Sequence, residues 1–110
     1  MSSGHGGEIT LDAATAAYGD VFSPNGARLT LVVEVGNDDA VDVTLQGSID
    51  GTNNWRDTAT VATALNNTGG HVGPAGGDGT IFAAWPYYRL KVSAGSSSSN
   101  VVTWRVKAFD

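Results

Sequence analysis

The chain has 110 residues and a mass of 11.3 kDa, enough for one domain with a single hydrophobic core. Its net charge of −5 argues against a dedicated nucleic-acid-binding protein, and no apolar run approaches the roughly 18 residues of a membrane-spanning helix. We therefore expect neither nucleic acid nor a membrane as partner. Cysteine is absent, which excludes disulfides and thiolate metal sites.

The first residues read MSSGHGGE, a glycine-rich segment that buries too little surface to offset the entropy lost on ordering. It also lacks the basic start and apolar middle of a signal peptide, so we expect none. We predict that residues 1–8 form a flexible N-terminal arm and that residues 9–110 form the single domain. A first strand is predicted within GEITLDA.

The rest of the chain alternates between apolar and polar residues with a period of two, which is typical of strands with one buried face. Turn clusters rich in Gly, Asn, Asp and Ser separate the runs. The pattern predicts an all-β protein, an antiparallel β-sandwich (jelly-roll or Ig-like) of about seven strands. In VDVTLQGSI we expect Val41, Val43, Leu45 and Ile49 inside and Asp42, Thr44, Gln46 and Ser48 outside. The expected core contains Leu31, Val33, Val43, Leu45, Leu90, Val92, Trp104 and Val106.

The turn after this run reads DGTNN, residues 50–54. Asp50-Gly51 is a strong hairpin signal, because Gly adopts the positive φ that the turn requires and Asp bonds to its own backbone. A calcium loop is the functional alternative, but the segment offers one carboxylate and no bidentate Glu downstream. We predict that the turn reverses a strand.

Residues suited to catalysis are few. His71 lies in GGHVGPAGG, whose glycines do not position a general base. The acids near residue 40 lie in a predicted turn, where solvated carboxylates are usual, and no lysine follows the glycines of 69–79 as a phosphate loop requires. We expect no enzymatic activity, no cofactor and no metal.

Four of the six basic residues fall in the last 22 positions: Arg89, Lys91, Arg105 and Lys107. Within each run they are two residues apart and share a face. If the two runs pair as a hairpin, these four residues form a basic stripe on the outer side of the sheet. The stripe is either an ordinary solvated face or a contact for an acidic partner surface.

We expect two of the three tryptophans to pack in or near the core and the third to be a candidate for binding. Trp104 lies between Val102 and Val106 at period two and is expected in the core, and Trp55 is expected in the core or at its rim. Trp85, followed by Pro86 and two tyrosines, could reach a partner, because Pro86 implies a bend or a sheet edge. The loop 66–79 is too long and glycine-rich to order by itself, so we expect it and the arm to lie against neighbouring subunits of a symmetric homo-oligomer, such as a trimer, with His71 near that contact.

Two runs, LQGSIDGTNNW and YYRLKV, resemble two groups of β-sandwich proteins. One group is the discoidin-like carbohydrate- and lipid-binding modules. The other is the small virion proteins of tailed bacteriophages, which include head-decoration and tail-associated β-sandwiches. The match covers roughly residues 41–56 and 86–92. The length, the Gly/Ser/Thr/Ala-rich composition and the lack of cysteine are closer to the virion group.

The resemblance implies a non-enzymatic virion structural protein on the capsid surface, a decoration or cement protein that binds the assembled shell and bridges subunits. The partners would be the major capsid protein or other virion subunits, contacted through Arg89, Lys91, Arg105, Lys107, Trp85, Tyr87 and His71. A tail or baseplate component is the nearest variant. A carbohydrate-binding module that uses Trp85, Tyr87, Tyr88 and the 50–54 turn is the alternative from another class, and a small secreted or enzyme-appended domain is a third.

Overall fold

The computed structural model describes residues 3–12, 14–24, 28–35, 41–65, 70–72, 81–82, 85–93 and 101–109. Within these ranges the chain forms strands and no helix, and hence no helix of the length and apolar character needed to cross a membrane. The strands are β1 (Ser3–Thr10), β2 (Ala17–Tyr18), β3 (Arg28–Val35), β4 (Val41–Ser48), β5 (Arg56–Leu65), β6 (Gly70–Val72), β7 (Ile81–Phe82), β8 (Tyr87–Val92) and β9 (Val101–Phe109).

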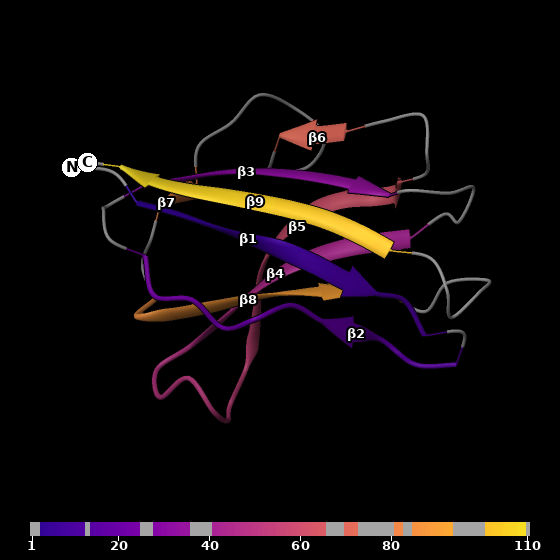
Figure 1. The fold of residues 1–110 in the computed structure, drawn as a ribbon. Coiled ribbons are helices and arrows are strands. Elements are labelled where there is room, and N and C mark those ends of the chain that lie inside the picture. The colour runs from indigo at the N-terminus through magenta and orange to yellow at the C-terminus, as the bar shows by residue number, and fades with distance from the viewer. Residues whose placement is uncertain are drawn as a thin grey trace.

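The strands form two antiparallel sheets that face each other (Figure 1). Sheet A has the order β1-β9-β3-β6, with β7 following β6 along the same edge of β3, and sheet B has the order β2-β8-β4-β5. Successive strands change sheet at every connection except β4–β5 and β6–β7, which is the connectivity of a jelly roll. The predicted all-β antiparallel sandwich is confirmed, and the short strands β2 and β6 are additions to the seven predicted runs.

The core lies between the two sheets and contains all eight residues that the alternation placed there. Each long strand contributes its inward-facing side chains, and residues outside the predicted set complete the core at its two ends. The buried apolar residues are Ile9, Leu11, Phe22, Leu29, Leu31, Val33, Val41, Val43, Leu45, Val61, Tyr88, Leu90, Val92, Val102, Trp104 and Val106.

Trp104 is the largest of these side chains and is only 2% exposed. It projects from β9 into the sandwich and contacts Phe22, with 5.7 Å between ring centroids, and Phe22 in turn stacks on Tyr88 of the opposite sheet at 6.0 Å. The three rings therefore connect sheet A to sheet B. Such aromatic pairs contribute roughly 0.5–1.5 kcal/mol each beyond the area that they bury.

Glycines make room for the indole of Trp104. A Cβ atom added to Gly19 would lie 3.1 Å from the indole Nε1 and 3.2 Å from Ile9 Cδ1, and one added to Gly7 would lie 3.6 Å from Nε1. The first of these contacts is tighter than side chains normally tolerate. Gly19 therefore allows the segment after β2 to lie against the indole. The contact at Gly7 would be an ordinary one; the tight position in β1 is Gly6, where an added Cβ would lie 2.8 Å from the Trp104 carbonyl oxygen.

This packing corrects the predicted N-terminal arm. Ser3–Glu8 are not outside the domain: they form most of β1 and pair with Thr103–Ala108 of β9 in regular antiparallel register. Low burial by the glycines was the basis of the prediction, but these residues gain backbone hydrogen bonds to β9 and allow close packing on Trp104. The glycines belong to the fold, at an edge of sheet A.

The end of β4 departs from the predicted alternation. Gln46 and Ser48 are buried, at 6% and 0% exposure, whereas Ile49 is 75% exposed. The strand ends at Ser48, so Ile49 lies in the following turn and no longer follows the strand period. Gln46 and Ser48 do face outward, but their side chains hydrogen-bond to neighbouring residues that cover them.

We predict that deletion of residues 1–8 destabilises the domain. The deletion removes six of the eight residue pairs between β1 and β9 and uncovers one side of Trp104. The free energy of unfolding should fall by at least about 2 kcal/mol, since each ladder hydrogen bond contributes on the order of 1 kcal/mol. Urea denaturation and the wavelength of tryptophan emission measure this. An unchanged unfolding midpoint with unshifted emission would mean that β1 is dispensable.

Candidate functional site

The most distinctive group of polar side chains lies on the outer face of sheet B and has Arg89 at its centre. The Arg89 Cζ atom lies 4.0 Å from the ring centroid of Tyr18 and 4.3 Å from that of Trp55. Tyr18 comes from β2, on one side of β8, and Trp55 lies just before β5, beyond β4 on the other side. The guanidinium is thus flanked by aromatic rings from both sides, an arrangement that favours Arg over Lys.

Gln46 fixes the inner edge of the same guanidinium. Its Oε1 accepts a hydrogen bond from Arg89 Nε at 2.8 Å, and its Nε2 donates to Asp57 Oδ1 at 2.9 Å. The register explains these contacts, because Gln46 pairs with Arg89 on β8 and with Asp57 on β5. Both ends of this buried amide are therefore satisfied, and its orientation is determined by its two neighbours.

Burial lowers the pKa of Arg89 from its usual value, and the charge interaction with Tyr18 opposes that shift. An arginine remains protonated in proteins, so the group carries a full positive charge in a partly desolvated position. Within the described part of the chain no carboxylate forms an ion pair with it, and its terminal amino groups have no hydrogen-bond acceptor. Arg89 is thus a preorganised cation, and within the described ranges nothing pairs with the outer edge of its guanidinium.

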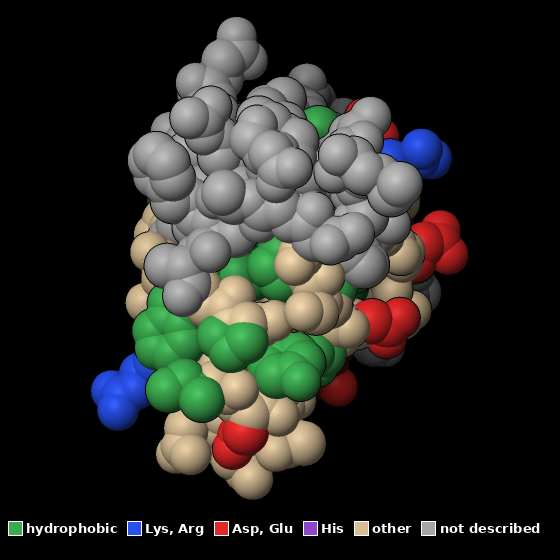
Figure 2. Space-filling model, turned by 90° about the vertical axis from the view of Figure 1, so that its left-hand side faces the viewer, with side chains coloured by type: hydrophobic (Ala, Val, Ile, Leu, Met, Phe, Trp, Pro, Cys, Tyr) green, Lys and Arg blue, Asp and Glu red, His purple; other side chains and the backbone are tan. Residues whose placement is uncertain are grey.

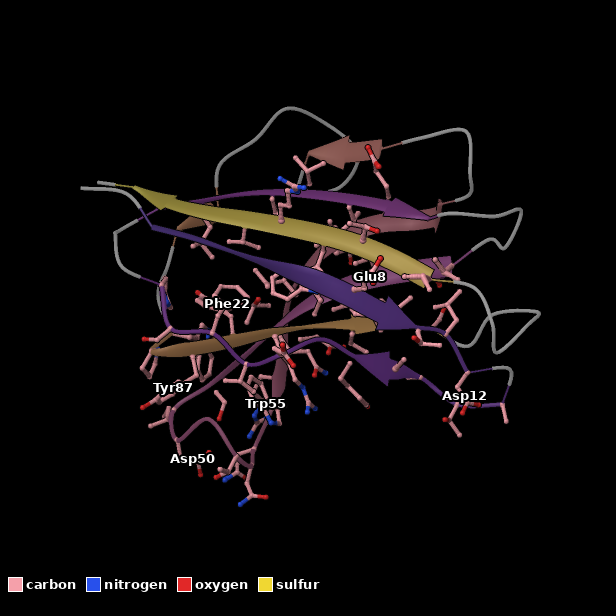
Figure 3. The ribbon with its side chains drawn as sticks, in the orientation of Figure 1. Glu8, Asp12, Phe22, Asp50, Trp55 and Tyr87 are labelled. Atoms are coloured by element: carbon pink, nitrogen blue, oxygen red, sulfur yellow. The ribbon has the colours of Figure 1, made fainter. Side chains whose placement is uncertain are left out.

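Exposed apolar side chains extend this face toward one end of the molecule. Tyr18 is 46% exposed and Tyr87 is 36% exposed, and Val21 and Ile49 are exposed as well. Ile49 follows the residue that pairs with Tyr87, and Val21 precedes the bridge between Phe22 and Tyr88. Figure 2 shows apolar side chains gathered at this end, and Figure 3 shows Tyr87 and Trp55 on the side of β8 that faces away from β1. We name Tyr18, Val21, Ile49, Trp55, Tyr87 and Arg89 the Arg89 face.

The turn of residues 48–54 lies next to Tyr87 and Trp55 of this face (Figure 3). Asp50 Oδ1 accepts hydrogen bonds from the backbone N–H groups of Thr52 and Asn53, at 3.0 and 2.9 Å, and from the Ser48 hydroxyl. These bonds, with Asn53 the largest contributor and Thr52 next, lower the pKa of Asp50 to about 2. Gly51 has φ +78°, and the ring of Tyr87 lies over it. The turn joins the antiparallel pair β4–β5, so the predicted strand reversal is confirmed.

The predicted basic stripe is not a single surface. The runs that carry its residues do not pair: β8 lies between β2 and β4 in sheet B, whereas β9 lies between β1 and β3 in sheet A. Arg89 and Lys91 therefore lie on one outer face of the sandwich and Arg105 on the opposite one. The connection between Val92 and Val101 is long enough to cross the roughly 10 Å between packed sheets, which a short hairpin could not do.

The other candidate residues have separate positions. Trp104 is in the core. Tyr88 is also buried, and the Tyr88 hydroxyl accepts a hydrogen bond from the backbone N–H of Trp85. Trp85 is half-buried and packs inward on Gly47, where an added Cβ would lie 2.5 Å from its ring. The predicted sugar platform of Trp85, Tyr87 and Tyr88 is therefore not assembled as one exposed surface. His71 lies in β6 and Lys107 in β9 by their backbones, and their side chains lie outside the described residues, as does most of the loop 66–79.

Sequence reasoning did not identify Tyr18, Gln46 and Asp57 as parts of a site. Each looks ordinary in the sequence, and only the strand order brings them beside Arg89. One signal was available: LQGSIDGTNNW and YYRLKV, the runs that carry the family resemblance, are neighbours in sheet B and supply Gln46, Trp55 and Arg89. Among the described residues no group of three His, Asp or Glu side chains could hold a metal ion.

Comparison with known proteins adds no further information on this face. No protein-family model matches the sequence, and no curated protein is significantly similar to it.

The turn should make stability depend on pH between about 4 and 2. Folding lowers the pKa of Asp50 from 3.8 to about 2, so the folded state favours the ionised carboxylate. Its contribution is fully present above the unfolded pKa and is lost as the pH falls through the folded pKa. Asp50→Asn keeps a side-chain acceptor but cannot titrate. The difference in unfolding free energy between wild type and this variant should shrink from pH 5 to pH 2 in urea titrations; a difference that stays constant would contradict the assignment.

Gly51→Ala should destabilise the domain by roughly 1–2 kcal/mol, the cost of a left-handed conformation for a residue with a Cβ atom. Contact with the Tyr87 ring, 3.1 Å from the added atom, increases that cost. Asn54 also has a positive φ, of 59°, and provides the matched control: Asn54→Gly should leave the thermal midpoint unchanged or raise it slightly. Equal melting temperatures for wild type and Gly51→Ala would rule out this strain.

Proposed function

We propose that this protein is a non-enzymatic virion structural protein of a tailed phage or phage-like particle that decorates the assembled capsid shell. It acts by adhesion: binding the shell and not free subunits stabilises the assembled state by mass action. The single observation that carries the proposal is the Arg89 face, in which exposed Tyr, Val and Ile side chains surround a half-buried Trp and Arg on the outside of sheet B. These residue types dominate the energetics of protein–protein interfaces.

The jelly-roll connectivity and the two runs that resemble virion proteins also support the proposal. Jelly rolls are used by viral capsid domains, although the fold also occurs in lectins and cupins and does not determine function. The expected partners are the major capsid protein or other virion subunits, with a symmetric homo-oligomer as the assembled form. A tail or baseplate position is the nearest variant, because the same adhesive face would serve there.

The second candidate is a carbohydrate-binding module, favoured by the exposed rings of Tyr18 and Tyr87. Against it, the residues first expected to form a sugar platform are divided between core and surface. The Arg89 guanidinium lies over the rings of Tyr18 and Trp55. The side of each ring that it covers cannot stack on a pyranose ring. A glycan array distinguishes the two: saturable binding that is lost in Tyr87→Ala would favour the module.

The decisive experiment begins with intact particles purified from the source culture on a density gradient. The protein should sediment with them. After it is removed, recombinant protein added back should rebind, and the affinity should fall as sodium chloride rises, since exposed charges more than about 8 Å apart are screened at physiological salt. Absence of the protein from purified particles would contradict the proposal.

The two faces of the sandwich provide a matched pair of variants for the add-back step. Arg89→Glu and Arg105→Glu change the net charge equally, but Arg105 is exposed on sheet A. Arg89→Glu should weaken rebinding at least tenfold, and Arg105→Glu should weaken it much less. Equal losses would mean that net charge, and not the Arg89 face, determines adhesion.

A further inference from the structure

We propose that the outer edge of the Arg89 guanidinium receives a carboxylate from an acidic segment of a partner protein. The inference deepens the proposed function, on which it rests for the kind of partner, because it names the chemistry that this face recognises. It depends on how the five N–H donors of this one side chain are distributed.

One of these donors is used in a hydrogen bond within the described part of the protein. Nε bonds to Gln46, while the two terminal amino groups have no acceptor among the described residues. The rings of Tyr18 and Trp55 flank the guanidinium, so a ligand approaches along its edge. A planar group approached along its edge presents parallel N–H bonds, the geometry that a carboxylate accepts in a bidentate manner.

Among the described residues no carboxylate forms an ion pair with Arg89. Asp57 is separated from Arg89 by Gln46 in the strand register, and Gln46 donates to its Oδ1. Asp20 lies in the segment that runs beside β8 between Gly19 and Phe22, which bond to Leu90 and Tyr88, and it forms no ion pair with Arg89. Gln46 thus holds the guanidinium as a neutral acceptor, and no ion pair in the described ranges balances its charge. Because the side chain is already held by two rings and one hydrogen bond, binding a carboxylate costs little further side-chain entropy.

The surroundings favour a protein segment over an acidic glycan. Val21 is aliphatic and exposed in the segment that runs beside Arg89, and it suits an apolar side chain next to the carboxylate. A sugar acid needs open aromatic faces for stacking, whereas the inner faces of Tyr18 and Trp55 are occupied by the guanidinium. Lys91, two residues from Arg89 on the same strand, adds positive charge that attracts an acidic segment.

The test uses the full chain and two short peptides, acetyl-Val-Glu-Val-amide and acetyl-Val-Gln-Val-amide. The side-chain N–H resonances of Arg89 are followed by ¹⁵N NMR as each peptide is added, with glucuronate as a third ligand. The Glu peptide should shift the Arg89 resonances saturably, and the Gln peptide should bind at least about tenfold more weakly, because hydrogen bonds to charged groups are stronger by that order.

Three variants locate the interaction. Arg89→Lys retains the charge but loses the planar fork; followed through the backbone amide resonances of β8 in both proteins, it should show no saturable binding of the Glu peptide. Tyr18→Leu retains Arg89 and removes one ring, and it should weaken binding severalfold, which keeps the test informative if an Arg89 variant folds poorly. Arg105→Lys on sheet A is the matched control and should bind as wild type does.

Each outcome separates the possibilities. Equal binding of the Glu and Gln peptides, no shift of Arg89, or equal loss in Arg105→Lys would overturn the proposal. Binding of glucuronate alone would also overturn it and identify an acidic glycan as the ligand. Glu-selective binding by a protein that is absent from purified particles would support carboxylate recognition and refute the virion assignment, so the two proposals fail independently.

Discussion

The indole of Trp104 is the constraint around which this sandwich is built. Gly19 lies closer to this ring than a side chain normally tolerates, and Gly6 lies equally tightly against the backbone carbonyl of Trp104. The chain segments that carry these glycines are thereby fixed, one in sheet A and the other beside β8. Phe22 and Tyr88 continue the aromatic contact into sheet B. The position of β2 and of the segment after it, and with it that of Tyr18 over Arg89, follows from this packing.

Alternation in the sequence was sufficient to predict the sandwich and its core. The period of two reports which face of a strand is buried, and that information is local. The period of two does not indicate which strands are neighbours in a sheet. Arg89 and Arg105 are close in the sequence and similar in context, yet they lie on opposite sheets because the connection between β8 and β9 crosses the sandwich.

The candidate site was predictable only in part for the same reason. Arg89 and Tyr87 were identified as exposed binding candidates, but Gln46 was expected to be solvated and Tyr18 was not considered. Their roles arise from register: Gln46 is buried because Arg89 and Asp57 are its cross-strand neighbours. The glycine-rich start of the chain was misjudged because low side-chain burial ignores the hydrogen bonds that an edge strand makes with its backbone.

The strand order has a consequence for how the chain folds during synthesis. β9, the last strand of this sequence, lies between β1 and β3 in sheet A, and Ser3 pairs with Ala108. Until residues 101–109 leave the ribosome, β1 lacks β9, its partner among the described strands, and Phe22 lacks its contact with the Trp104 indole. Sheet B, whose strands all precede β9, can form earlier. Such non-local pairing makes folding slow, on the order of milliseconds to seconds, and exposes the apolar inner face of sheet B to other chains until β9 is in place.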